Sequence, residues 1–321
     1  MKVEEIRNIG VIGAGLMGHG IAQVFAIKGY KVKLFDNDSG VLKSAPERIR
    51  NNLQTLLEMG LVEFRELEDC LNRIQLCHTL TEMCEGVELA IEAVSENLDL
   101  KRTIFSDLER LTPPQTILCS NTSGISISLI SEKLQFKERV VGTHFWNPPH
   151  IIPCVEVIKS QFGSDEVFHT VVELMKRVGK EPVRVLIDVP GFLGNRLQHA
   201  LWREAISLVE KGIAEPEDID RVVKYGFGLR LPFLGPLETA DLAGLDLTYD
   251  VHQYLFLDLE NRSTPSPLLK TLVDQKTIGV KAKKGFYHWT DESIKQIIQQ
   301  RDEALLKITE VIKGLNREKK K

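Results

Sequence analysis

A histidine and a glutamate twelve residues apart carry the clearest acid–base signal in this 321-residue chain. His144 follows an apolar run, and Glu156 interrupts a second apolar run that comes after the Asn-Pro-Pro break at 147–149. A carboxylate buried without a partner is costly, so Glu156 needs a polar group close to it. A single histidine at a strand end is commonly structural, but pairing it with Glu156 accounts for both side chains. We therefore expect an acid–base pair.

The chemistry of such a pair follows from its two residue types. An imidazole with an unperturbed pKa of ~6.5 can accept and release a proton near neutral pH. A carboxylate bonded to the second ring nitrogen fixes the tautomer and stabilises the imidazolium as it forms. The pair therefore suits oxidation of a hydroxyl group, in which a base takes the hydroxyl proton while hydride leaves carbon.

A glycine-rich turn near the N-terminus has the pattern of a site for the cofactor that would accept this hydride. Its sequence fits G-x-G-x-x-G, it follows a β-branched run, and it precedes a helical pattern. Such a turn lets the backbone approach a dinucleotide pyrophosphate at a helix N-terminus. The alternative is a structural glycine turn without a ligand. We expect the cofactor to contact the turn residues Gly13, Gly15, Leu16, Met17 and Gly18.

Asp36 indicates which dinucleotide binds. It ends the second predicted strand, where an acidic residue accepts hydrogen bonds from the adenosine ribose hydroxyls. Its neighbours are Asn37 and Asp38, and no arginine stands beside it to bind a 2′-phosphate. The sequence therefore predicts NAD rather than NADP.

The elements that must position these residues are predicted from apolar periodicity. Strands are expected at 9–13, 30–36, 87–94, 116–122, 139–145, 154–159 and 182–188. Helices are expected around 21–26, 98–111 and 166–178, with a helical hairpin over 39–73 that turns near Met59-Gly60. This alternation predicts an α/β fold with a Rossmann-type, doubly wound sheet. Beyond Val189-Pro-Gly191 helical periodicity dominates, so we expect a dinucleotide-binding domain at 1–188 and an all-helical domain at 189–321.

The carboxyl ends of the predicted strands gather further polar residues. Ligands bind at these ends in open α/β sheets. Three strands are followed in turn by Glu92, Glu96 and Lys101, by Asn121, Thr122 and Ser123, and by His144.

Taken in order, these motifs resemble the L-3-hydroxyacyl-CoA dehydrogenase family. The resemblance rests on GxGxxG, EAVSEN, SNTS, HFWNP, GFLGNR and GVKAKKGFYHW, which together span nearly the whole chain. It implies NAD-dependent, reversible oxidation of an L-3-hydroxyacyl-CoA to a 3-ketoacyl-CoA in fatty acid metabolism. It also implies a helical second domain that forms a homodimer.

The resemblance also implies roles for single residues. His144 is similar to the family's catalytic histidine and Glu156 to its carboxylate partner. Ser123 matches the serine that hydrogen-bonds the reacting oxygen, beside both substrate and cofactor, and Asn195 matches an asparagine of the site at the start of the second domain. Glu96 and Lys101 match residues near the nicotinamide ribose.

Two segments depart from the family pattern. Acyl-CoA members bind the adenosine end of CoA with basic residues on the helical hairpin, but residues 58–69 here are mostly acidic, and only Lys43, Arg48 and Arg50 could compensate. The chain also carries Arg230 in an inserted loop, as do relatives that oxidise free 3-hydroxy acids such as gulonate and carnitine. The alternative substrate is therefore a free 3-hydroxy acid whose carboxylate binds Arg230. Arg230 could instead pair with Glu238 or with an acidic residue at the domain interface.

Two other classes of protein remain as rivals. One branch of the family is a lens crystallin, so a structural protein is possible, and a nucleotide-sensing module is another. Neither needs the complete set His144, Glu156, Ser123 and Asn195.

The composition of the chain limits the kinds of molecule that it is expected to bind. A net charge of −4 argues against a general nucleic-acid binder. The five scattered cysteines form no Cys-x-x-Cys pair, so we expect neither a metal site nor disulfides, and a cytoplasmic location fits. No apolar stretch reaches the ~18 residues of a membrane helix, and the expected partner is a small-molecule substrate.

Overall fold

A computed structural model describes residues 1–318, without the side chains of residue 313 and residues 316–318. The chain forms two compact units, residues 1–196 and residues 197–321. The division falls in the first turn of helix α8 (Gly194–Glu210), a few residues beyond the predicted boundary at 188/189.

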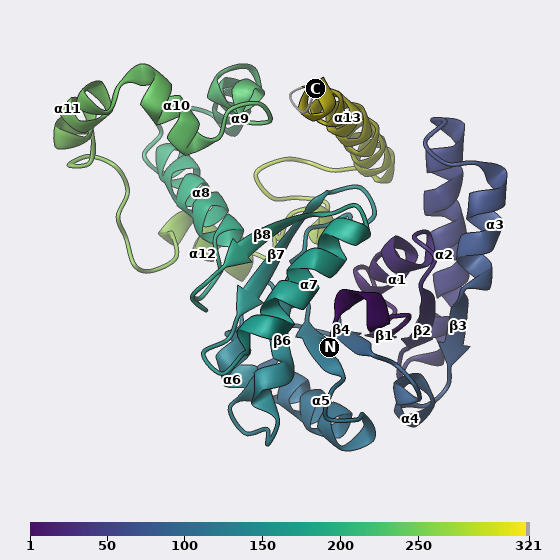
Figure 1. Ribbon diagram of the computed structural model, residues 1–321. Helices are drawn as coiled ribbons and strands as arrows, with labels where there is room; N and C mark the ends of the chain where they lie inside the picture. Colours follow the sequence, from purple (N-terminus) through teal and green to yellow (C-terminus); the bar gives the residue numbers. More distant parts are fainter. Residues whose placement is uncertain (319–321) are drawn as a thin grey trace. The chain divides into compact units, whose positions relative to one another are not determined.

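Unit 1 is built on an eight-stranded sheet with the order β3-β2-β1-β4-β5-β6-β7-β8 (Figure 1). The first six positions have the strand order of a dinucleotide-binding doubly wound sheet. All neighbours run parallel except β6 and β7. The strands are β1 (Asn8–Ile12), β2 (Lys31–Phe35), β3 (Ile74–Cys77), β4 (Leu89–Glu92), β5 (Ile117–Ser120), β6 (Val140–Phe145), β7 (Cys154–Lys159) and β8 (Glu181–Val185).

Helices cover both faces of this sheet. α4, α5 and α6 share one apolar core with the strands, and α1 and α7 pack on the sheet as well (Figure 1). Polar side chains cap several of them: Asp38 accepts hydrogen bonds from two amides of α2, and Asn97 accepts one in α5. The helices are α1 (Gly18–Ala26), α2 (Ser39–Glu58), α3 (Phe64–Asn72), α4 (Leu80–Cys84), α5 (Leu98–Leu111), α6 (Ile127–Ser131) and α7 (Asp165–Arg177), with 3₁₀ turns η1 (Val3–Glu5) and η2 (Lys137–Arg139).

The regular elements of unit 2, as far as it is described, are helical. They are the rest of α8, α9 (Pro216–Tyr225), η3 (Phe227–Arg230), α10 (Pro236–Ala243), α11 (Leu245–Leu255), α12 (Pro267–Asp274), η4 (Val280–Ala282) and α13 (Asp291–Glu318). The predicted fold class, a Rossmann-type unit followed by a helical one, is confirmed.

The sequence prediction missed three short elements of unit 1. β3, α4 and α6 have only four or five residues each. β3 forms one edge of the sheet, and its burial alternates between half-buried and exposed before Cys77. So short a strand carries too few apolar residues for its periodicity to stand out.

Candidate active site

His144 and Glu156 face each other on the antiparallel strands β6 and β7, in direct register. His144 Nδ1 lies 2.7 Å from Glu156 Oε2, and the two residues are 4% and 2% exposed. The chain reverses between them through 146–153, which makes these strands antiparallel. The structure therefore brings the predicted pair together.

The second oxygen of Glu156 is held by a turn that leads into α8. Glu156 Oε1 accepts hydrogen bonds from the backbone N–H groups of Leu193 and Gly194, each at 2.9 Å. Burial alone would raise the pKa of Glu156, but the hydrogen bonds from His144, Gly194 and Leu193 outweigh it and lower the pKa. The carboxylate is therefore charged at neutral pH.

A charged Glu156 decides the tautomer of His144. A carboxylate can only accept, so Nδ1 carries the proton and Nε2 presents a lone pair. Two aromatic rings hold the imidazole: Trp146 at 5.0 Å and Phe192 at 5.9 Å between ring centroids. The site thus holds an imidazole of fixed orientation whose Nε2 is free to accept a proton, beside a carboxylate that is itself held by two backbone amides.

The turn at 190–194 depends on two unusual backbone positions. Phe192 is fully buried and has a φ of 50°, in the left-handed region that side chains rarely adopt. At Gly194 a Cβ atom would lie 2.2 Å from the indole of Trp146. Sequence reasoning used the GFLGNR motif for Asn195 only and did not find the role of its backbone.

The glycine turn has the shape that a dinucleotide needs. Gly13 has a φ of 93°, and a Cβ at Gly18 would collide with Gly13 O at 1.6 Å, so the turn and α1 pack too tightly for side chains. Nothing lies within 4 Å of the Cβ position of Gly15, which leaves room for a phosphate. Leu16 is exposed beside it, and Met17 stands at the N-cap of α1. These residues fit a bound dinucleotide.

Two charged side chains clamp the middle of this turn. Asp36 Oδ2 accepts a hydrogen bond from Ala14 N at 2.7 Å, while Arg48 Nη2 donates to Ala14 O at 2.7 Å. Arg48 Nη1 also lies 3.2 Å from Nδ1 of His19. Arg48 comes from α2, 34 residues after Ala14. Because its contacts are set by tertiary packing, no local motif could have identified it.

Glu96, Lys101 and Ser123 form part of one polar network beside the glycine turn. Glu96 Oε1 accepts hydrogen bonds from Thr122 Oγ1 at 2.6 Å and Ser123 N at 3.0 Å. Lys101 is fully buried and donates to Glu92 Oε1 at 2.7 Å, with Glu96 Oε2 at 3.6 Å. Lys101 therefore holds the carboxylates in place rather than projecting from the surface.

Ser123 and Asn195 are also brought together within unit 1. Asn195 Nδ2 donates to the backbone oxygen of Ser123 at 2.6 Å, and Ser123 itself is exposed. A further hydrogen bond, from Phe145 N to Asn121 Oδ1 at 2.9 Å, links strand β6, which carries His144, to the loop that carries Ser123.

Arg230 belongs to unit 2, whereas the other predicted site residues belong to unit 1. It ends η3 in unit 2 and is exposed. Among the described residues Arg230 makes no ion pair, and the carboxylate of Glu238 instead accepts from Gly235 N at the start of α10. The structure does not show the pair between Arg230 and Glu238 among the described residues, and the other alternative, pairing with an acid at the domain interface, stays a prediction.

Across residues 1–318 no group of three or more His, Cys, Asp or Glu side chains is arranged to hold a metal ion. Over the same residues no helix is long and apolar enough to cross a membrane.

Comparisons with known proteins match the chain along most of its length. Residues 8–189 match the model of the 3-hydroxyacyl-CoA dehydrogenase NAD-binding domain, and residues 191–289 match that of the C-terminal domain. The chain belongs to the 3-hydroxyacyl-CoA dehydrogenase family. It is an NAD-dependent oxidoreductase of this type, as the motifs predicted.

Two curated members of the family illustrate its range of substrates. The chain is 34% identical to the 5-formyl-3-hydroxy-2-methylpyridine 4-carboxylate 5-dehydrogenase of Mesorhizobium japonicum, over 96% of this chain and 99% of the relative. It is 37% identical to a probable 3-hydroxybutyryl-CoA dehydrogenase of Bacillus subtilis, over 90% and 99%.

Solved structures show the same two kinds of member. The crystal structure of the pyridine-carboxylate dehydrogenase superposes with a TM-score of 0.90 at 33% identity, covering 96% of this chain and 99% of that one. The (S)-3-hydroxybutyryl-CoA dehydrogenase of Ralstonia eutropha gives 0.75 at 31% identity, covering 89% and 100%.

Proposed function

We propose that the protein oxidises a hydroxyl group of a small acidic substrate with NAD, using His144 as the general base. The observation that carries this proposal is the buried pair in which Glu156 binds His144 on one oxygen and two amides on the other. Bound NAD would supply the hydride acceptor. The chain's part is to take the hydroxyl proton at His144 Nε2 and to stabilise the resulting imidazolium with Glu156, an arrangement commonly worth ~10²–10⁴ in rate.

The other polar residues assist that step. Ser123 is exposed beside the network of Glu96 and is suited to donate a hydrogen bond to the reacting oxygen. Asn195 holds the backbone of Ser123 and thereby orients it. The glycine turn and Asp36 hold the dinucleotide, and Glu96 lies near its nicotinamide ribose.

A free hydroxy acid is the substrate class that we place first. Of the three cationic residues that could bind CoA from the hairpin, Arg48 is directed into the glycine turn and Arg50 pairs with Glu68 at 2.8 Å. Arg230, in contrast, has an uncommitted guanidinium, which suits bidentate binding of a carboxylate. The near full-length match to a dehydrogenase named for a pyridine carboxylate supports this order.

A 3-hydroxyacyl-CoA is the second candidate. It is favoured by the relatives named as 3-hydroxybutyryl-CoA and hydroxyacyl-CoA dehydrogenases, which match about nine-tenths of the chain. With that substrate the protein would act in fatty acid metabolism.

Turnover of a substrate panel with an Arg230→Ala variant tests the two candidates. NADH formation is followed with 3-hydroxybutyrate, carnitine, gulonate, 5-formyl-3-hydroxy-2-methylpyridine 4-carboxylate and 3-hydroxybutyryl-CoA. We expect the substitution to raise KM for the active free acid by about 10–100-fold, because it removes a charge-assisted hydrogen bond. Arg221→Ala removes another exposed arginine of unit 2 and serves as the control. The proposal of a free hydroxy acid is refuted if only the thioester is oxidised, or if Arg230→Ala leaves the rate of NADH formation unchanged with every substrate.

A homodimer is the second part of the proposal, and it rests on unit 2. Of its described side chains only Ser207, Ile219 and Leu306 are buried, whereas many large apolar residues are exposed, including Leu237 at 81% and Leu257 at 87%. A surface with so many apolar side chains indicates a partner.

We also place the protein in the cytoplasm, since all five cysteines are free thiols.

A further inference from the structure

No step of the proposed reaction uses the buried ion pair at the end of β4. Glu92 is the last residue of that strand, Lys101 lies near the start of α5, and both side chains are fully buried. Lys101 Nζ donates to Glu92 Oε1 at 2.7 Å. Apolar residues of similar volume are often at least as stabilising as a buried ion pair, so a pair at this position indicates a role in positioning.

Both oxygens of Glu92 have fixed partners. Oε1 accepts a hydrogen bond from Val94 N at 2.7 Å in addition to the one from Lys101, and Oε2 accepts from Ser120 Oγ at 2.7 Å. Ser120 ends the neighbouring strand β5 and lies beside Glu92 in register. The ends of two strands therefore fix this carboxylate, and the carboxylate in turn fixes the ammonium group of Lys101.

A second carboxylate lies just beyond hydrogen-bonding distance of Lys101. Glu96 Oε2 is 3.6 Å from Lys101 Nζ, and the side chain of Glu96 is 44% exposed. Three donors of the loop 122–124 bond to the other oxygen, Oε1: Thr122 Oγ1 at 2.6 Å, Ser123 N at 3.0 Å and Gly124 N at 3.1 Å. Glu96 thus holds the loop that carries Ser123 with one oxygen, and its other oxygen faces the ammonium group without a hydrogen bond.

We propose that Glu92 is a positioning residue that keeps Lys101 from binding Glu96. Because Lys101 is held by Glu92, Glu96 keeps Oε1 on the Ser123 loop and leaves Oε2 available to the cofactor. Lys101 itself is fully buried, so it acts on a bound molecule only through Glu96. This inference rests on the proposed function, in which Ser123 contacts the reacting oxygen and Glu96 lies near the nicotinamide ribose.

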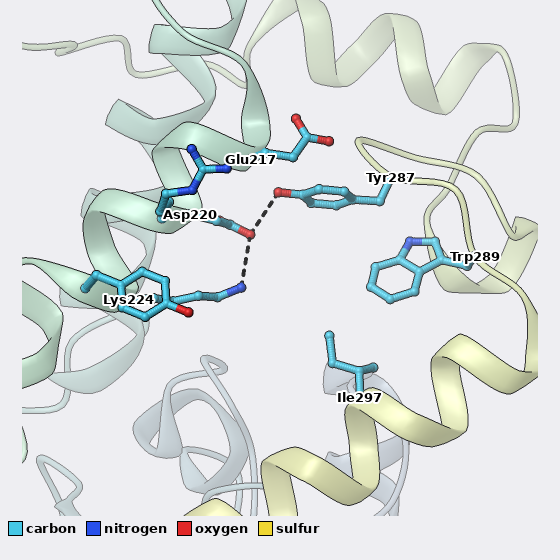
Figure 2. A pocket seen from close by; sticks show the side chains of 8 residues that line it. Glu217, Asp220, Lys224, Tyr287, Trp289 and Ile297 are labelled. Atoms are coloured by element: carbon cyan, nitrogen blue, oxygen red, sulfur yellow. Dashed lines mark hydrogen bonds and ion pairs between the residues drawn. The ribbon is translucent and has the colours of Figure 1, made fainter.

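Burial gives the pair this effect, as an exposed pair of the same kind shows. Lys224 and Asp220 lie 3.9 Å apart beside the pocket of unit 2, and their side chains are 65% and 52% exposed (Figure 2). Water can replace either partner there, so such a pair contributes little. Lys101 has no contact with water. If Glu92 lost its charge, Lys101 would turn to the carboxylate of Glu96, which is already 3.6 Å away.

Glu92→Gln removes the charge but keeps the size of the side chain, and amide hydrogen exchange reports its effect on the loop. We expect Glu96 to be drawn towards Lys101, so that the amides of Ser123 and Gly124 exchange at least about tenfold faster. In steady-state NADH formation kcat should fall by about 10–100-fold, because the loop that places Ser123 is no longer held. KM for the hydroxy substrate should change little.

Two control variants separate the charge of Glu92 from the stability of the fold. Ser120→Ala removes a hydrogen bond from Glu92 but keeps its charge, so it should lower the melting temperature without faster exchange at Ser123. Asp220→Asn makes the same carboxylate-to-amide change beside an exposed lysine, and it should change neither the exchange nor kcat. Faster exchange at Ser123 in Ser120→Ala would show that general loosening of the fold, and not the charge, controls the loop.

Removing the ammonium group together with the carboxylate decides the proposal. In the double variant Glu92→Gln, Lys101→Met nothing draws Glu96 away from its loop, so slow exchange at Ser123 and most of the lost kcat should return. If the double variant is no more active than Glu92→Gln, Lys101 acts on the cofactor directly and the proposal is wrong. Unchanged exchange at Ser123 in Glu92→Gln also overturns it.

Two further results have a defined meaning. If Glu92→Gln does not fold, the double variant is compared with the wild type directly, and a loss of kcat of more than about tenfold overturns the proposal, whereas a smaller loss supports it. If the wild type forms no NADH with any hydroxy substrate, the proposed function fails, but the exchange rates at Ser123 still test the role of Glu92.

Discussion

Replacing Glu156 by glutamine keeps the shape of the side chain but removes its charge, and the surrounding hydrogen bonds determine the consequence. Leu193 N and Gly194 N both donate to Glu156 Oε1. In the variant the amide oxygen must occupy that place, because an NH₂ group cannot accept hydrogen bonds. The NH₂ group then faces His144 Nδ1, which has to become an acceptor. The proton moves to Nε2, and the base is blocked.

The size of the defect follows from the cost of the alternative orientation. Turning the amide around would restore the reactive tautomer but leave two buried N–H groups without an acceptor. Each such group costs ~1–3 kcal/mol, or ~2–6 kcal/mol together. Since ~1.4 kcal/mol is a factor of ten, the reactive tautomer becomes rarer by roughly 30–10⁴-fold. Loss of the charge that stabilises the imidazolium adds to this, so we expect kcat to fall by about 10²–10⁴-fold.

Steady-state NADH formation and NAD affinity, measured separately, check the reasoning. The dissociation constant of NAD should change little, because Glu156 makes no contact with the glycine turn among the described residues. Glu156→Asp keeps the charge and should recover part of the activity. Glu88→Gln neutralises a carboxylate that binds the amides of Arg7 and Asn8, and should be silent. A Glu156→Gln enzyme within fivefold of wild-type kcat would refute the tautomer argument.

Two further predictions concern the cofactor and pH. Asp36→Ala removes the acceptor of Ala14 N, so the dissociation constant of NAD should rise about tenfold and the preference over NADP should shrink, whereas Asp38→Ala should leave that preference intact. Burial lowers the pKa of His150 to about 4, with His19 and Lys180 contributing. His150 therefore takes up a proton near pH 6.5 in the unfolded chain but only near pH 4 in the folded chain. Above pH 6.5 it is neutral in both states, and as the pH falls below 6.5 protonation stabilises the unfolded chain, so the folded state loses stability. Between pH 7 and 5 the free energy of unfolding should fall by up to about 2 kcal/mol more than in His150→Asn, as measured by chemical denaturation. Equal slopes would mean that His150 is not buried as a neutral ring.

Local patterns were sufficient to predict those parts of the fold whose cause is local. The β-branched runs, the glycine turn and the acidic end of β2 each carry their own signal, and the Rossmann-type sheet followed from them. The pairing of His144 with Glu156 was also accessible, because a carboxylate in an apolar strand needs a partner. Its geometry depends on the reversal between β6 and β7, which residue types alone do not specify.

The contacts that could not be predicted are those made by long side chains and by backbone. Lys101 has the residue type of a surface cation, yet it is buried against Glu92. Arg48 reaches the glycine turn from α2, whose exposed residues are a mixture of charged and uncharged polar types. The long side chains of Lys101 and Arg48 could each reach several carboxylates or backbone carbonyls. The packing of the surrounding helices and strands determines which of these groups they bind.

The turn at 190–194 shows most clearly why the GFLGNR motif could not predict every group of the site. The two amides that keep Glu156 charged belong to Leu193 and Gly194, where α8 begins, and α8 continues as one helix into unit 2. A backbone N–H group has no residue type, so no sequence pattern could assign it to the site. Its direction depends on the left-handed backbone of Phe192 and on the missing side chain of Gly194, beside Trp146. The acid–base pair is therefore built by the two strands β6 and β7 and by the start of helix α8. A side chain added at Gly194 should displace these two amides and so raise the pKa of Glu156, although no ionisable group has been changed.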